Sequence, residues 1–237
     1  MIDLSADLGE GSLGEEDIWP LVTSANIACG GHTGDGESMT DASLQALKYG
    51  VRLGAHPSYP DLGGFGRRSM TMEPRALRQS LFEQISGLQE IAERHGVTLR
   101  HVKPHGALYN DAHHDHALAV TIIEAITEAG DDIAIVCPDR SQMAVAAREA
   151  NLAVIREAFA DRRYNADGSL VSRSETGALL SVPESVEQAA LLATEGAVSA
   201  RDGTRVPVAF DTLCIHADMN RAVERLRAIR QRLGGIR

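Results

Sequence analysis

Four histidines each close a short apolar run in a different part of the chain: His32, His56, His105 and His216. Histidine is the side chain whose ordinary pKa lies nearest to neutrality. Four of them at the ends of apolar runs therefore indicate proton transfer or metal ligation. Packing alone would not place histidines so regularly.

Charged side chains occupy comparable positions. Asp7 and Glu10 follow the first apolar run and are candidates for a general base or a metal ligand. Lys103 is the last residue of another apolar run, where a lysine needs a partner because an unpaired buried charge is costly. We therefore expect Lys103 to belong to a site. The residue types leave open whether a divalent metal lies at Asp7, His32 and His56.

Three segments could bind an anion. The glycine-rich turn 29–36, which contains His32 and Asp35, could form a nest of backbone N–H groups before a helix, or simply a tight turn. It matches neither a Walker A loop nor a dinucleotide fingerprint. The long loop 56–70 carries Arg67, and segment 157–164 carries Asp161 and Arg162. Planar guanidinium groups suit a carboxylate or a phosphate, although surface ion pairs explain these arginines comparably well.

Composition restricts the class of protein. The 237 residues are 43% hydrophobic with a formal net charge of −10, so we expect no nucleic-acid partner. Three cysteines without a CxxC pair fit a reduced, cytoplasmic protein. The first residues lack the features of a signal peptide, and no apolar run reaches the ~18 residues of a membrane span. A homo-oligomer is left open.

Apolar runs alternate with helical patterns along the chain. Strands are expected at 2–7, 25–29, 51–56, 98–103, 132–137, 153–157 and 209–215. Helices are expected at 37–49, 74–95, 115–129, 143–150, 184–195 and 219–233, with small β excursions near 164–170 and 198–208. Polar residues follow all seven strands, and only in a barrel do all strand ends meet. We predict one α/β domain over 1–237, an irregular seven-stranded (β/α) barrel.

Six motifs in order resemble those of the LamB/YcsF family, and the resemblance covers essentially the whole chain. They are Asp7-Leu-Gly-Glu10, residues 24–30 with His32 and Asp35, residues 54–61 with 64–68, residues 102–110, residues 159–162 with 167–168, and residues 214–216. The chain departs from the family pattern at Ser5, Ala6, Gly31, Gly36, Ala217 and Met219. These departures bear on the substrate and not on the class of reaction.

The resemblance implies a barrel of the glycoside hydrolase/deacetylase type. It also implies an ATP-dependent 5-oxoprolinase that hydrolyses the lactam of 5-oxo-L-proline to L-glutamate, with ATP as co-substrate together with Mg²⁺, and with partner subunits B and C. The chain has no P-loop, so the nucleotide site is either an unusual loop of this chain or lies on the partners.

Three hypotheses follow for the function. The first is the ATP-dependent lactam hydrolase, the second a metal-dependent deacetylase or amidase without ATP, and the third a non-catalytic binding subunit. For the first, Lys103 and His105 are expected to polarise or protonate the amide, while Asp7 and His56 activate water. The expected catalytic residues are Asp7, His56, Lys103, His105 and His216. Glu10, His32, Asp35, Arg67, Asp161 and Arg162 are expected to bind substrate or phosphate.

Overall fold

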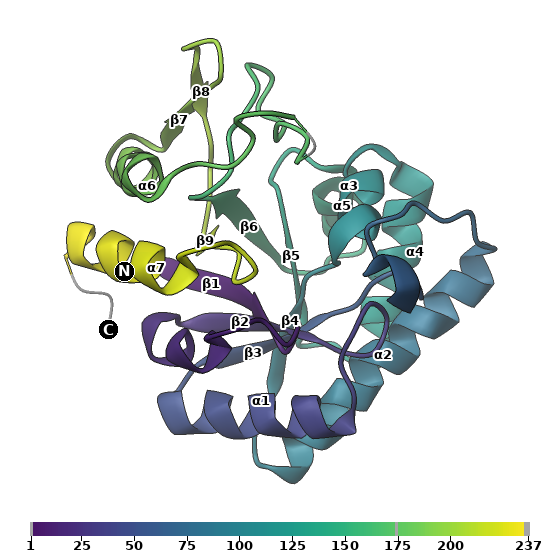
Figure 1. Ribbon diagram of the computed structural model, residues 1–237. Helices are drawn as coiled ribbons and strands as arrows, with labels where there is room; N and C mark the ends of the chain where they lie inside the picture. The colour runs from purple at the N-terminus through teal and green to yellow at the C-terminus, as the bar shows by residue number, and fades with distance from the viewer. Residues whose placement is uncertain (1, 174, 235–237) are drawn as a thin grey trace.

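Seven parallel strands close into a barrel in the order β1-β2-β3-β4-β5-β6-β9 (Figure 1). The computed structural model describes residues 2–173 and 175–234. The strands are β1 (Asp3–Leu8), β2 (Ser24–Ala28), β3 (Arg52–His56), β4 (Leu99–Val102), β5 (Ala134–Cys137), β6 (Val154–Phe159) and β9 (Thr212–Cys214). Strand β9 pairs with both β1 and β6, which closes the sheet. The predicted seven-stranded (β/α) barrel is confirmed.

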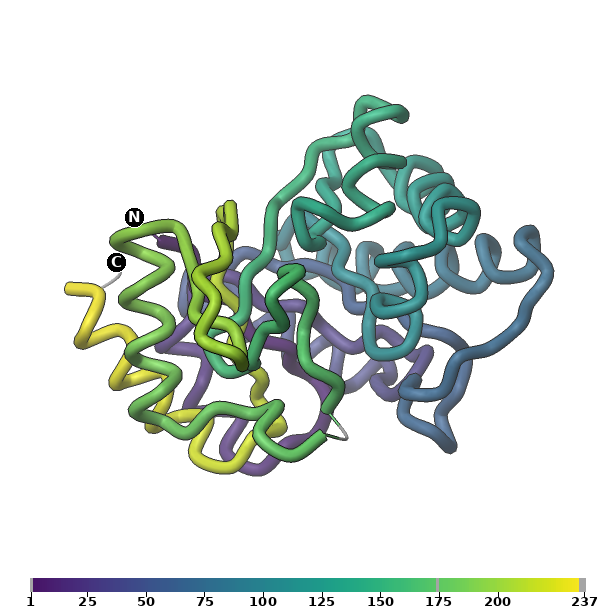
Figure 2. Tube along the Cα trace, turned by 90° about the horizontal axis from the view of Figure 1, so that it is seen from above, coloured from purple at the N-terminus to yellow at the C-terminus, as the bar shows by residue number. Residues whose placement is uncertain are grey.

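Helices surround the barrel because each has one apolar stripe that packs inward. They are α1 (Gly36–Tyr49), α2 (Pro74–Arg94), α3 (Gly106–His114), α4 (His116–Ala129), α5 (Gln142–Glu149), α6 (Val182–Glu195) and α7 (Ala222–Arg232). In α2, Leu77, Leu81, Ile85 and Leu88 are buried at three- and four-residue steps. Helix α6 begins with a capping box formed by Ser181 and Glu184. Figures 1 and 2 show α2 on the opposite side of the barrel from α6 and α7.

Several elements make the barrel irregular. Two short 3-10 helices, η1 (Glu15–Asp17) and η2 (Trp19–Leu21), stand in place of an α-helix after β1, and a third, η3 (Leu62–Gly64), lies in the loop after β3. The expected excursions are present, as a Tyr164 to Leu170 bridge and as the antiparallel pair β7 (Ala197–Ser199) and β8 (Arg205–Pro207). Helix α3 was not predicted.

The interior of the barrel contains polar side chains as well as apolar ones. His101 and Asn26 are buried inside it, and the Thr212 hydroxyl donates to that of Ser5 over 3.0 Å. Gly54 makes room for His101, because a Cβ at position 54 would overlap the imidazole ring. Among the described residues, no helix is long and apolar enough to cross a membrane. The inside of the barrel is thus lined partly by hydrogen-bonded polar side chains.

Candidate active site

A cavity of about 1070 Å³ opens at the carboxyl ends of the barrel strands. Its volume lies at the upper end of the range for small-molecule sites. Parallel strands bring residues far apart in the sequence to this one mouth. The predicted site residues that line it are Asp7, Glu10, His56, Arg67, Lys103, His105, Arg162 and His216.

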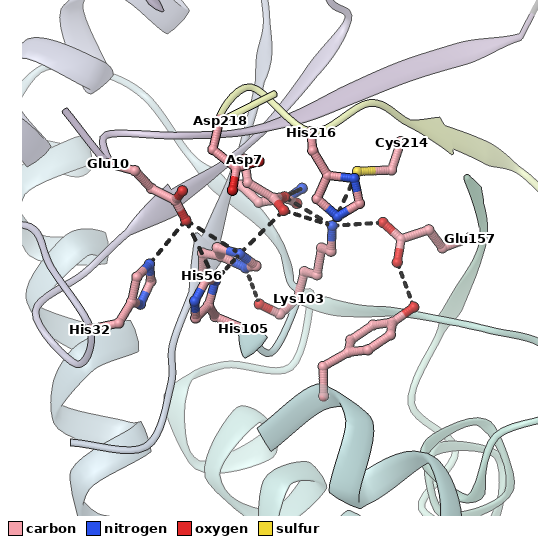
Figure 3. Close-up of polar contacts among 12 residues, drawn as sticks. Asp7, Glu10, His32, His56, Lys103, His105, Glu157, Cys214, His216 and Asp218 are labelled. Carbon is pink, nitrogen blue, oxygen red and sulfur yellow. Dashed lines mark hydrogen bonds and ion pairs between the residues drawn. The ribbon is translucent and has the colours of Figure 1, made fainter. Parts of the chain in front are cut away.

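Lys103 lies at the floor of the cavity between two carboxylates (Figure 3). Its Nζ is 2.9 Å from Asp7 Oδ1 and 2.9 Å from Glu157 Oε1, and the Lys103 side chain is nearly fully buried. Burial by itself would lower the pKa of Lys103, but the Asp7 carboxylate raises it well above its usual value. The lysine is therefore a fixed cation and not a proton donor at neutral pH.

Asp7 is held as a carboxylate from two sides. Burial alone would raise its pKa, but His56 and Lys103 hold the pKa of Asp7 well below its usual range. The Asn26 amide also donates to Asp7 Oδ1 over 2.8 Å, and His101 Nε2 donates to Asn26 Oδ1 over 2.9 Å. Burial lowers the pKa of His101 to about 4, so the ring is neutral and can orient the amide. Asp7 is consequently a weak base, which disfavours the role expected for it.

Glu157, the second carboxylate beside Lys103, is itself held by a tyrosine. Its Oε2 accepts a hydrogen bond of 2.6 Å from the hydroxyl of Tyr109, which lies on α3. The Cys214 thiol is 3.2 Å from Lys103 Nζ, and burial raises the pKa of this thiol well above its usual value. Cys214 is therefore a neutral neighbour of the lysine and not a thiolate nucleophile.

Two histidines meet beside this floor with their nitrogens 3.0 Å apart, namely His56 Nε2 and His105 Nδ1. The other nitrogen of each ring faces a backbone carbonyl, since His56 Nδ1 is 2.7 Å from Lys103 O and His105 Nε2 is 3.0 Å from Phe65 O. A carbonyl can only accept, so those outer nitrogens carry the hydrogens. In the neutral rings both inner nitrogens therefore carry a lone pair and no hydrogen. Because two facing lone pairs repel, a proton or a metal ion is required between them.

Glu10 and His32 lie next to this pair. Glu10 Oε1 is 3.1 Å from His32 Nε2 and 3.5 Å from His105 Nδ1. The His32 ring stacks on that of His105 with centroids 3.6 Å apart, and it does not line the cavity. Burial lowers the pKa of His105 to about 2, while Asp7 raises the pKa of His56 against the effect of burial. His32 thus supports the site from behind.

His216 forms a separate pair with Asp161. Its Nδ1 is 3.0 Å from Asp161 Oδ1, and its backbone N–H donates to Asp161 Oδ2 over 2.7 Å. The ring also stacks on Phe159, with centroids 5.5 Å apart. Asp161 is fully buried, and despite that burial His216 keeps the pKa of Asp161 below its usual value. A carboxylate that fixes Nδ1–H leaves Nε2 as the basic atom of the histidine.

Arginines surround the mouth of the cavity. Arg67 and Arg173 both pair with Asp218 Oδ2, at 2.8 Å and 3.2 Å. Arg162 is 92% buried and donates from one terminal nitrogen to the carbonyl of Val171 over 2.7 Å. Its Nε has no hydrogen-bond partner. Among the described residues, no carboxylate lies within ion-pair distance of the Arg162 guanidinium, although the charge of the neighbouring Asp161 favours its charged form.

Three of the expected site residues lie away from the cavity surface. His32 is behind His105, and Asp35 is exposed at the start of α1, where its carboxylate accepts from the backbone N–H groups of Glu37 and Ser38. Asp35 does not line the cavity, because its oxygens are used in capping the helix. Asp161 is also set back, where it holds His216.

Sequence reasoning missed several residues of the site. It places Glu157 at a strand end but assigns it no role, although that position was a usable signal. Asn26 is a polar residue inside a buried strand, which also signals a constrained environment. Tyr109 lies in the 102–110 motif but received no role, and Asp218 gave no comparable signal, because the partners of both are distant in the sequence.

The family model described as LamB/YcsF family matches residues 2–236. The chain is 44% identical over 238 residues to a protein of Chloroflexus aggregans named as the A subunit of 5-oxoprolinase, covering 98% of this chain and 94% of that one. It is 46% identical to the protein of the same name from Methylococcus capsulatus, covering 98% and 92%.

A solved structure is also similar. The lactam utilization protein of Thermus thermophilus superposes with a TM-score of 0.92 at 39% identity, covering 98% of this chain and 95% of that chain. This match agrees with a closed (β/α) barrel along nearly the whole length. The sequence comparisons and the structure comparison therefore agree with each other.

Proposed function

We propose, from the fact that the chain belongs to the LamB/YcsF family, that it opens the lactam of 5-oxo-L-proline to give L-glutamate, as the A subunit of an ATP-dependent enzyme. The names of its relatives support hydrolysis of a cyclic amide and imply other subunits in a complex. The ATP dependence, the partner subunits B and C and the identity of the substrate are parts of the proposal.

The observation that carries the proposal is that Arg162, whose guanidinium forms no direct ion pair, lines the same cavity as His216, the histidine that Asp161 orients. A buried cation that forms no direct ion pair favours an anionic ligand, and 5-oxoproline carries one carboxylate on its ring. An uncharged carbohydrate amide would leave Arg162 unpaired. This favours the lactam over the deacetylase alternative.

The remaining residues can be assigned to steps of amide hydrolysis. His216 Nε2 is the base that removes a proton from the attacking water, with Asp161 holding the ring and stabilising its charged form. The Lys103 ammonium stabilises the negative charge that develops on the carbonyl oxygen. The carbon–nitrogen bond then breaks, and the ring nitrogen takes up a proton from the histidine. This assignment gives His216 the role expected for Asp7.

Opening a five-membered lactam is difficult because the amide is unactivated and the product recloses easily. Coupling to ATP supplies the driving force if the γ-phosphoryl group is first transferred to the carbonyl oxygen of the lactam and ADP leaves. Water then attacks the activated carbon, the carbon–nitrogen bond breaks to leave a glutamyl phosphate, and a second water releases phosphate and L-glutamate. The exposed pair Arg67 and Arg173 at the mouth could contact a phosphate by exchanging Asp218 for it. Because no P-loop is present in the sequence, partner subunits could instead provide the nucleotide site.

Glutamate release from 5-oxoproline tests the proposal. The chain should be assayed together with subunits B and C, with ATP, without ATP, and with a non-hydrolysable ATP analogue. We expect glutamate only with hydrolysable ATP, and about one ADP for each glutamate. His216→Ala should lower turnover by ~10²- to 10⁴-fold in the same assay. Glutamate release that is independent of ATP, or absent from the full assembly, would exclude this function.

A further inference from the structure

Three ligand atoms of different residues surround one point beside the cavity. They are His56 Nε2, His105 Nδ1 and Glu10 Oε1, and all three residues line the cavity. The two nitrogens are 3.0 Å apart, and the oxygen is 3.5 Å from His105 Nδ1 and 3.9 Å from His56 Nε2. Figure 3 shows these side chains pointing toward one another. The three residues come from three different strand ends, so local sequence does not explain the arrangement.

The distances fit the edges of a metal coordination shell. Ligand atoms about 2.0–2.1 Å from a tetrahedral ion lie roughly 3.3 Å from one another. The three observed separations, from 3.0 to 3.9 Å, bracket that value. A single proton would join the two nitrogens, but it would not account for the carboxylate beside them.

The outer nitrogens of both histidines are fixed in the manner of metal ligands. Each donates to a backbone carbonyl, His56 to that of Lys103 and His105 to that of Phe65. Such outer hydrogen bonds set the tautomer so that the inner nitrogen presents its lone pair. Phe65 adopts a left-handed backbone with φ of 54°, which is unfavourable for a residue with a side chain. The loop is therefore held in a strained conformation at the point where it presents this carbonyl.

The charge of the neighbourhood also favours a cation. Asp7, Glu10 and Glu157 are three buried or nearly buried carboxylates. Among the described residues, Lys103 is the only lysine or arginine that forms an ion pair with any of them. With both imidazoles neutral, as metal ligands are, three carboxylates and one ammonium leave two negative charges in a poorly solvated place. One divalent ion would balance them.

We propose that Glu10, His56 and His105 bind one divalent transition-metal ion of the Zn²⁺ class, with a further position open to the cavity. Two imidazoles and one carboxylate suit such an ion, whereas Mg²⁺ and Ca²⁺ prefer an all-oxygen shell. This set differs from Asp7, His32 and His56, because Asp7 is engaged by Lys103 and His32 by Glu10. An ion there would act as a Lewis acid toward a carbonyl or a water. The site is argued from coordination alone and does not depend on the proposed reaction.

Metal content and metal binding test this site. The chain should be purified without a histidine tag, stripped with a chelator, and then titrated with Zn²⁺ and with Co²⁺ as a spectroscopic probe. We expect one ion per chain, a Co²⁺ absorption spectrum with nitrogen ligands, and a higher melting temperature with Zn²⁺. His105→Gln and Glu10→Gln should each weaken binding by at least ~100-fold, since loss of even an outer partner costs 10- to 100-fold.

A matched control uses a histidine pair outside the proposed site. His113 and His114 lie on α3 with ring centroids 4.5 Å apart, and they could bind a metal adventitiously. The double variant H113A/H114A should keep the ion, and H105Q should lose it. Far-ultraviolet circular dichroism should show that both variants are folded. Retention of the ion by H105Q, its loss from H113A/H114A, or no binding of Zn²⁺ at micromolar concentrations would overturn the proposal. An imidazole ¹⁵N spectrum with a proton on His56 Nε2 in excess Zn²⁺ would overturn it too.

Discussion

The floor and the mouth of the cavity are both built from ion pairs, but they differ in burial. At the floor, Lys103 and Glu157 have side chains that are 4% and 0% exposed, whereas Arg67 at the mouth is 50% exposed. Removing one partner of a buried pair leaves an uncompensated charge, while an exposed pair is screened by water. The floor is thus suited to fixed charges for catalysis, and the mouth to exchange of one anion for another.

The largest effect is expected from Lys103→Met, which breaks the floor. It leaves Asp7 and Glu157 buried without their cation, so the free energy of unfolding should fall by about 3–5 kcal/mol. Turnover should fall by at least ~100-fold. Denaturant unfolding and steady-state kinetics measure both effects. The other lysine of the chain, Lys48, is exposed, and Lys48→Met is the matched control that should change neither.

If Lys103→Met does not fold, Glu157→Gln gives a milder test of the same point. It keeps the shape of the side chain and the contact with Tyr109. We expect reduced turnover and a smaller loss of stability than for the lysine variant. If both floor variants unfold and turn over like the wild type, the buried charges of the floor contribute no more than the exposed pairs of the mouth, and the comparison is wrong.

Asp161→Asn keeps the His216 side chain but removes the carboxylate that orients it, so it tests how much turnover depends on that orientation. The amide cannot stabilise the charged imidazole, so turnover should fall by ~10²- to 10⁴-fold. His216→Ala should have an effect of similar size, and the double variant should be little worse than either single one, because the pair acts as a unit. Additive losses in kcat would show that the two residues act separately.

A pH effect is expected beneath the floor. His101 has a pKa of about 4 in the folded chain because it is buried, against an ordinary value of 6.5. At His101, the unfolded chain binds a proton below about pH 6.5, whereas the folded chain binds it only near pH 4. The contribution of the neutral ring to stability is therefore complete above pH 6.5 and is lost as the pH falls from about 6.5 to about 4. The loss should reach about 3 kcal/mol, at ~1.4 kcal/mol per pH unit. Thermal melts of His101→Gln should show a shallower pH dependence, and those of the exposed His114→Gln should not.

The smallest effect on stability is expected at the mouth. Asp218→Asn removes the shared partner of Arg67 and Arg173, both of which are partly exposed, so the free energy of unfolding should change by less than about 1 kcal/mol. Arg67→Lys should raise KM for 5-oxoproline or for ATP without lowering stability, because a point charge replaces a planar fork. An unchanged KM with a lowered melting temperature would make this arginine a purely structural residue.

The same contrast decides what could be predicted from the sequence. The strands were predictable because they are continuous apolar runs, and a closed barrel brings their ends together. The lining positions of Asp7, His56, Lys103, His105 and His216 follow from that rule. The position of the His32 side chain does not follow from that rule, because a residue just beyond a strand can point into the cavity or away from it.

Contacts at the mouth were beyond the reach of the sequence. Asp218 lies 151 residues after Arg67, and nothing in the spacing of loop residues fixes how two loops meet. The capping role of Asp35 was readable from the helix that follows it, but capping and anion binding favour the same residue types at a helix start. The distinction needed the position of α1 relative to the cavity.

Discrimination between two lactams tests most directly whether the cavity recognises a carboxylate next to the amide it opens. The assembled enzyme should be assayed with 5-oxoproline and with 2-pyrrolidinone, which lacks the carboxylate, using the wild-type chain and Arg162→Met. We predict that the wild type prefers 5-oxoproline by at least ~100-fold in kcat/KM, since a bidentate charged contact is worth a few kcal/mol. In Arg162→Met that preference should largely disappear. An unchanged preference in the variant, or no preference in the wild type, would contradict the account.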